Sequence, residues 1–125
     1  MNFPDDLLYS GAHLWVKDLG QGLARVGVTD FAQDQLGRVI YVDLPSLGQA
    51  VAAGGEMGAV ESAKSVSDLI SPVSGQVAAV NSTLADEPAP INDDPYGSGW
   101  LAEIKLAGPM PAGLMSAEAY GRLVS

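Results

Sequence analysis

The stretch VESAKSVSDLISPVSGQV, residues 60–77, places a lysine among small and polar side chains between two apolar runs. The first run covers residues 57–62 and the second covers residues 66–70. Both have the length and the content of β-branched and apolar residues that are typical of strands. Because only residues 63–65 separate the runs, we expect a β-hairpin with Lys64 at its tip.

Further short strands are predicted on both sides of this hairpin, over residues 14–16, 23–28, 39–44 and 100–106. The first two flank a turn-forming segment and indicate a second hairpin. In the strand that starts at Val39, simple alternation predicts that Val39, Tyr41 and Asp43 share one face. The segment 85–99 is so rich in Pro, Asp, Asn and Gly that we expect an irregular loop there.

Two short helices complete the predicted elements. Thr29 can cap a helix near residues 29–36, which Gly37 is placed to end. Ser116 can begin a C-terminal helix. The apolar side of that second helix is predicted to consist of Ala117, Tyr120, Leu123 and Val124.

The chain has 125 residues, which fits one domain, 1–125, with one core. Hydrophobic residues make up 47% and charged residues 17%, and Gly and Pro are scattered along the whole length. Many short strands with frequent turn residues indicate a mostly β protein.

Charge and cysteine content exclude several classes of function. The net charge of -9 repels nucleic acid phosphates and anionic lipid, so we expect neither nucleic acid nor a membrane as partner. The same charge favours docking onto positively charged patches of partner proteins, and it fits equally well a role in solubility alone or an adaptation to a saline habitat. With no cysteine, disulfides, thiolate metal sites and cysteine nucleophiles are excluded. No secretion signal or transmembrane-length stretch is recognisable, and we expect a cytoplasmic protein.

Residues that could carry out catalysis are scarce. His13 is the only histidine, and the adjacent Asp93 and Asp94 lack the spacing of a calcium loop. No metal site and no nucleophile turn is recognisable. The simplest interpretation of His13 is a ring packed beside Trp15, and the sequence predicts no catalytic residue.

Lys64 differs from an ordinary surface lysine in its setting. A lysine between two strands is usually a solvated turn residue. Here it is one of only three lysines, it stands at the predicted hairpin tip, and its neighbours Ala63 and Ser65 are small. A modifying enzyme needs steric access to a protruding amine, and this setting provides it.

These residues resemble the H proteins of the glycine cleavage system. The strongest element is the stretch 60–77, and the resemblance extends to residues 26–33 (VGVTDFAQ), 42–45 (VDLP) and 92–101 (NDDPYGSGWL). The resemblance spans nearly the full length of the chain. It implies a barrel-sandwich hybrid, a flattened fold of two antiparallel sheets.

The resemblance also implies a function for Lys64. It would carry lipoic acid in amide linkage, as N6-lipoyllysine, with Glu61 and Asp68 as hairpin and cleft neighbours and His13 near the cleft. The protein would be a non-catalytic carrier, because the cofactor supplies the chemistry. Its implied partners are a lipoate ligase or lipoyl transferase, glycine decarboxylase, aminomethyltransferase and dihydrolipoyl dehydrogenase, and its implied role is aminomethyl transfer.

One motif departs from the family pattern. Family members typically have a serine just before the histidine and a glutamate just after it, where this chain has Ala12 and Leu14. An arm that carries an amine would therefore find fewer polar partners, so two further hypotheses stay open. One is an H-like lipoate-binding protein that serves a heterodisulfide-reductase-like complex in sulfur oxidation. The other is an unlipoylated protein-interaction module.

Overall fold

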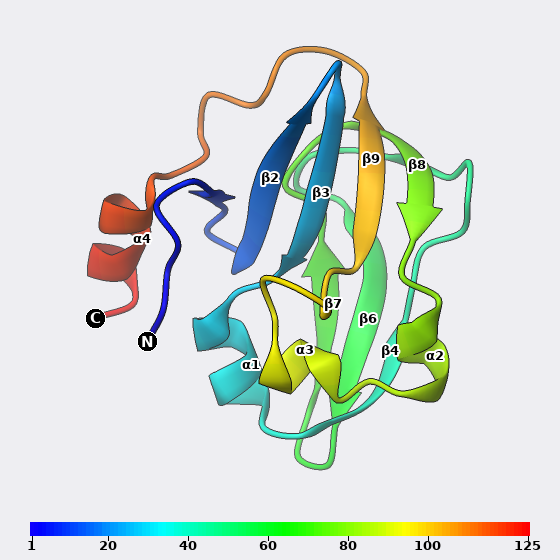
Figure 1. Ribbon diagram of the computed structural model, residues 1–125, viewed down its shortest axis with the longest axis vertical. Coiled ribbons are helices and arrows are strands. Elements are labelled where there is room, and N and C mark those ends of the chain that lie inside the picture. The colour runs from blue at the N-terminus through cyan, green and yellow to red at the C-terminus, as the bar shows by residue number, and fades with distance from the viewer.

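The computed structural model describes residues 1–125 and contains two antiparallel β-sheets with short helices at their ends (Figure 1). The larger sheet has the order β1-β2-β3-β9-β8-β5, and the smaller one has the order β4-β6-β7. Neither sheet closes on itself. The strands of the larger sheet are β1 (Leu8–Tyr9), β2 (Leu14–Gly20), β3 (Leu23–Val28), β9 (Ala102–Leu106), β8 (Gly75–Val80) and β5 (Ala50–Val51). Those of the smaller sheet are β4 (Val39–Asp43), β6 (Glu56–Ser62) and β7 (Val66–Ile70).

The helices are α1 (Asp30–Leu36), α2 (Thr83–Asp86), α3 (Pro90–Asp93) and α4 (Ala117–Leu123). None of them combines the length and the apolar character that crossing a membrane requires. The strands predicted before residue 71 are all present, and the last predicted strand begins two residues late, at Ala102. The predicted mostly β, barrel-sandwich class is confirmed.

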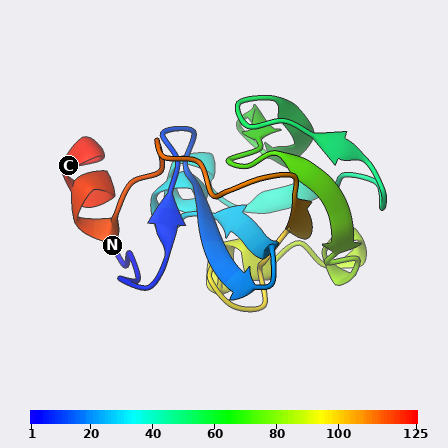
Figure 2. The same ribbon diagram turned by 90° about the horizontal axis from the view of Figure 1, so that it is seen from above.

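The main core is an apolar layer to which both sheets contribute. Its 17 buried residues include Val26 and Ile104 from the larger sheet and Val60 and Leu69 from the smaller one. A second, smaller cluster includes Trp15. It lies beneath α4, which sits at the edge of the molecule, far from the green strands in both views (Figures 1 and 2).

Strand β4 departs from the predicted alternation. Val39 and Val42 are both buried, whereas Ile40 and Tyr41 are both about half exposed. The prediction that Val39 and Tyr41 share a face is therefore wrong. A β-bulge causes the difference, because the register with β6 shifts between Val39 and Tyr41 and leaves Ile40 as an extra residue.

Helix α1 forms as predicted. The Thr29 side chain accepts a hydrogen bond from the backbone N–H of Ala32 at 3.1 Å, which satisfies one free donor of the first turn. Gly37 follows the last helical residue with φ of 76°, a conformation that disfavours residues with a Cβ.

The segment 85–99 is not irregular throughout, so that expectation is wrong. Helix α2 reaches into it and α3 lies within it, each as a single helical turn. Pro90 stands at the start of α3, where its fixed φ suits a helix and its missing N–H costs nothing. The fully buried side chains of Leu84 and Ile91 attach these turns to the core.

The C-terminal helix also forms, with the Ser116 side chain accepting from the N–H of Ala119. Ala117 and Tyr120 are buried, but Leu123 is 55% exposed, so the predicted apolar side was too wide. Seven residues make only two helical turns, and such a short helix contacts the sheet over a narrow strip.

The close approach of two strands at Gly27 gives a stability prediction. Gly27 pairs with Trp15, and a Cβ on Gly27 would lie 2.6 Å from the Trp15 ring. That ring is fully buried, and its Nε1 donates to the Pro95 carbonyl at 3.0 Å. We expect Gly27→Ala to lower the free energy of unfolding by about 1–3 kcal/mol in urea denaturation, because the ring has no space to move.

Gly11→Ala is the matched control, because a Cβ at Gly11 would meet nothing within 4 Å. Equal unfolding midpoints for the two variants would contradict the packing described for Gly27.

Candidate functional site

The turn between β6 and β7 is closed by a short backbone hydrogen bond. The N–H of Ser62 donates to the Ser65 carbonyl at 2.8 Å, and Ser62 itself is only 5% exposed. Its Oγ lies 3.4 Å from the N of Lys64 and 3.3 Å from the N of Ser65. The turn projects from the lower end of the molecule in Figure 1, and Lys64 is at its tip as predicted.

The side chain of Lys64 is exposed and runs past the end of α1. Its Cε lies 3.2 Å, and its Nζ 3.6 Å, from the position that a Cβ on Gly37 would occupy. A glycine at this point leaves room for the lysine stem. Asn92 fixes the same junction, because its Nδ2 donates to the Gly37 carbonyl at 2.9 Å and its Oδ1 accepts from the N–H of Val39.

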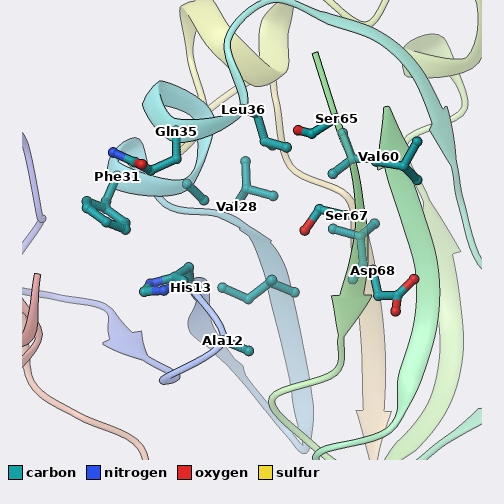
Figure 3. A pocket seen from close by; sticks show the side chains of 14 residues that line it. Ala12, His13, Val28, Phe31, Gln35, Leu36, Val60, Ser65, Ser67 and Asp68 are labelled. Carbon is teal, nitrogen blue, oxygen red and sulfur yellow. The ribbon is translucent and has the colours of Figure 1, made fainter. Parts of the chain in front are cut away.

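A cavity of about 360 Å³ opens beside the lysine. It lies between β7, an unpaired edge of the smaller sheet, and a wall formed by α1 and the start of β2 (Figure 3). Its lining includes Ser65, next to Lys64 in the chain. Phe31 and Leu36 lie on the opposite wall. Leu14, at the start of β2, also lines the cavity. The cavity has the size of a small-molecule site, for which about 300–1,000 Å³ is usual.

Most of the side chains around this cavity are apolar. Ala12 and Leu14, the two positions that depart from the family motif, both line it, and Leu14 is only 2% exposed. Among the lining residues only His13 and Asp68 are ionisable. Such a cavity suits a neutral, largely apolar chain better than a charged one.

The predicted neighbours Glu61 and Asp68 lie close to the lysine along the two strands, but on the outer face of the sheet. Asp68 pairs with Ala59, whereas the residue before it, Ser67, pairs with the buried Val60. Successive side chains point to opposite faces of a strand. Figure 3 accordingly shows Ser67 turned toward the cavity and the Asp68 carboxylate turned away from His13, although Asp68 contributes to the cavity edge.

His13 lies on the wall opposite β7, with a positive φ of 71°. Its ring contacts Phe31, with centroids 4.9 Å apart, and its Nδ1 is 2.8 Å from the Tyr120 hydroxyl. The expected packing beside Trp15 is therefore wrong, because the ring partners of His13 are Phe31 and Tyr120. Burial lowers the pKa of His13 from its ordinary value of 6.5.

Tyr120 links the C-terminal helix to the cavity wall. Its hydroxyl also lies 2.8 Å from Oγ1 of Thr29, the residue that caps α1. Burial raises the pKa of Tyr120, so the hydroxyl stays protonated and available as a donor. No local pattern predicts this link, because 107 positions separate Tyr120 from His13.

Comparison with known proteins gives consistent matches over nearly the whole chain. The family model described as glycine cleavage H-protein matches residues 7–125. The glycine cleavage system H protein of Micrococcus luteus is 54% identical over 121 residues, covering 95% of this chain and 94% of that protein. The corresponding protein of Marinobacter nauticus is 49% identical, covering 98% and 95%. A crystal structure of a glycine cleavage system H protein from Mycobacterium marinum superimposes with a TM-score of 0.89 at 40% identity, covering 97% of this chain and 98% of that one.

The environment of His13 gives a prediction about pH. Its folded-state pKa lies below 6.5, so the unfolded chain binds more protons over the interval between the two values. The stability contributed by neutral His13 is therefore complete above about pH 6.5 and is lost as the pH falls through the folded-state pKa. We expect proton NMR titration of the single histidine to give a midpoint below 6.5.

The same protein in concentrated urea is the control, and there the imidazole should titrate near its ordinary value of about 6.5. A folded-state pKa at or above the value in urea would contradict the burial described for His13.

Proposed function

This chain belongs to the glycine cleavage H-protein family, and we propose that it carries lipoate in amide linkage on Lys64. The protein acts as a non-catalytic carrier, a single lipoyl-carrier domain over residues 1–125. Its role is aminomethyl transfer between the enzymes of glycine cleavage.

The observation that carries this proposal is the position of Lys64. Its amine is exposed at the tip of a closed turn, and a largely apolar cavity of about 360 Å³ begins at the next residue. The residues present fit a lipoyl group, because an exposed amine permits attachment and an apolar cavity can receive the hydrocarbon part of the arm. Lys17 and Lys105, the other two lysines, do not line this cavity.

Attachment requires only the amine of Lys64 from this chain. Deprotonated Nζ attacks the carbonyl carbon of a lipoyl adenylate, which the ligase makes from lipoate and ATP with release of pyrophosphate. The C–N bond forms, the bond from that carbon to the AMP oxygen breaks, AMP leaves and Nζ gives up a proton. The product amide is uncharged, so burial of the arm no longer carries the cost of burying an ammonium group.

Bound lipoate supplies a dithiolane that can be reduced and can carry a one-carbon group. The protein's own residues then hold and shield the arm. Leu14, Phe31 and Leu36 exclude water from the cavity, and neutral His13 adds no charge to its wall. Tethering to Lys64 raises the effective concentration of the arm at each partner enzyme.

The proposed partners are a lipoate ligase or lipoyl transferase, glycine decarboxylase, aminomethyltransferase and dihydrolipoyl dehydrogenase. The alternative role in sulfur oxidation has no support from the family match or from the relatives named above, and we do not propose it. Glu61 and Asp68 lie on the outer face of the sheet, and we assign them to contacts with partner enzymes rather than with the stored arm.

Substitution of single lysines tests the proposal. We expect Lys64→Arg to gain no lipoyl group from a lipoate ligase with lipoate and ATP, because a guanidinium does not form the amide. Lys105→Arg, the matched control on β9, should be modified like the wild type and should support glycine cleavage with the three other enzymes. Intact-mass and peptide mass spectrometry measure the modification, and evolution of carbon dioxide from glycine measures the activity.

Lipoylation of the Lys64→Arg variant, or a wild-type protein that stays unmodified beside an active ligase, would contradict the proposal. The second result would leave the unlipoylated interaction module as the remaining hypothesis.

A further inference from the structure

Large apolar side chains are exposed next to the lysine-bearing turn. Ile40 is 53%, Tyr41 54% and Val66 67% exposed, and these three residues define what we call the apolar patch. Val66 follows Lys64 by two positions. Tyr41 on β4 and Val66 on β7 both pair with Glu61 on β6, which lies between them. The side chains of Tyr41, Glu61 and Val66 therefore form one row across the smaller sheet.

The backbone conformation of β4 causes the exposure of two residues of the apolar patch. The β-bulge in β4 turns two successive residues, Ile40 and Tyr41, outward while Val39 and Val42 stay buried. Without the bulge, strict alternation would put one of the two outward residues on the core side. Exposed apolar clusters of this kind mark interaction sites when polar residues surround them.

Carboxylates surround the apolar patch. Glu61 stands in the same row, and Asp43 and Asp68 stand in the next row on either side of Ala59. Both aspartates are exposed. No free arginine offsets these carboxylates, because Arg38, the nearest in the sequence, pairs with Asp93 at 3.3 Å. The other two arginines, Arg25 and Arg122, also pair with glutamates outside this surface.

We propose that the apolar patch and its carboxylates form the docking surface for the enzyme that acylates Lys64. The occupant is a protein with an apolar contact region rimmed by basic side chains. This inference rests on the proposed function, since the enzyme must reach the amine at the tip of the same hairpin. Val66, at one end of the row formed with Tyr41 and Glu61, is two positions after Lys64 in the sequence. A protein that contacts Val66 is therefore close to the Lys64 amine.

The carboxylates around the apolar patch disfavour other binding partners, namely a second copy of this chain, nucleic acid and anionic membranes. A second copy would bring Glu61, Asp43 and Asp68 against the same three carboxylates, because a two-fold interface is self-complementary. Nucleic acid and anionic membranes are repelled by the same groups and by the net charge of -9. A basic partner protein is attracted, and this attraction weakens as salt is added.

Acylation kinetics test the docking surface, with a lipoate–protein ligase, lipoate and ATP as the assay. We expect Tyr41→Ser to raise the KM for this protein about tenfold with kcat nearly unchanged, because Lys64 and its turn are intact. Tyr41→Phe, which keeps the apolar ring, should stay close to wild type. We also expect the KM of the wild type to rise with ionic strength.

The matched control is Leu123→Ser. Leu123 is exposed to the same degree, 55%, but lies on α4 at the far edge of the molecule (Figure 1). Thermal unfolding shows whether Tyr41→Ser folds. If it does not, Ile40→Ser serves as the second test variant, and we expect the same rise in its KM.

The outcomes separate the two proposals. If the wild type is acylated on Lys64 and the Tyr41→Ser and Ile40→Ser variants have the same KM as the wild type, the docking surface is wrong. The proposed function is then unaffected. An equal rise in KM for Leu123→Ser also overturns the docking surface. A wild-type protein that is not acylated at all overturns the proposed function and, with it, this inference.

Discussion

The register of β6 between β4 and β7 is the constraint on which the site depends. Val42, Val60 and Leu69 are buried on the core side of this three-stranded sheet, and their burial fixes which residues face outward. A slip of β6 by one residue would turn Val60 toward solvent and bury Glu61 instead. The exposed turn at Lys64, the apolar patch and the cavity-facing position of Ser67 therefore share one cause.

The opposite wall of the cavity has a separate support. The hydroxyl of Tyr120 contacts both His13 and Thr29, so the C-terminal helix, the start of β2 and the cap of α1 are held together at one point. Tyr120 and Thr29 are buried and His13 is half-buried, and this burial lowers the pKa of His13 and favours its neutral form. The cavity thus lies between a hairpin fixed by strand pairing and a wall fixed by a side-chain network.

Local patterns in the sequence predicted much of this arrangement. The hairpin at Lys64, the capped helix after Thr29 and the helix after Ser116 depend on neighbouring residues, and all three form. The features that the sequence did not predict depend on residues that are distant in the chain. The partner of His13 is 107 positions away, the bulge in β4 requires the register with β6, and the turn at Pro90 is held by burial of the residue after it. The outward direction of Asp68 follows from the same register.

Lipoate on Lys64 is best sought by peptide mass spectrometry of the protein isolated from its own cells. We expect a lipoyl group on the peptide that contains Lys64 and none on the peptides that contain Lys17 or Lys105. A Lys64 peptide found only in its unmodified form, in cells whose other lipoyl proteins are modified, would contradict this expectation.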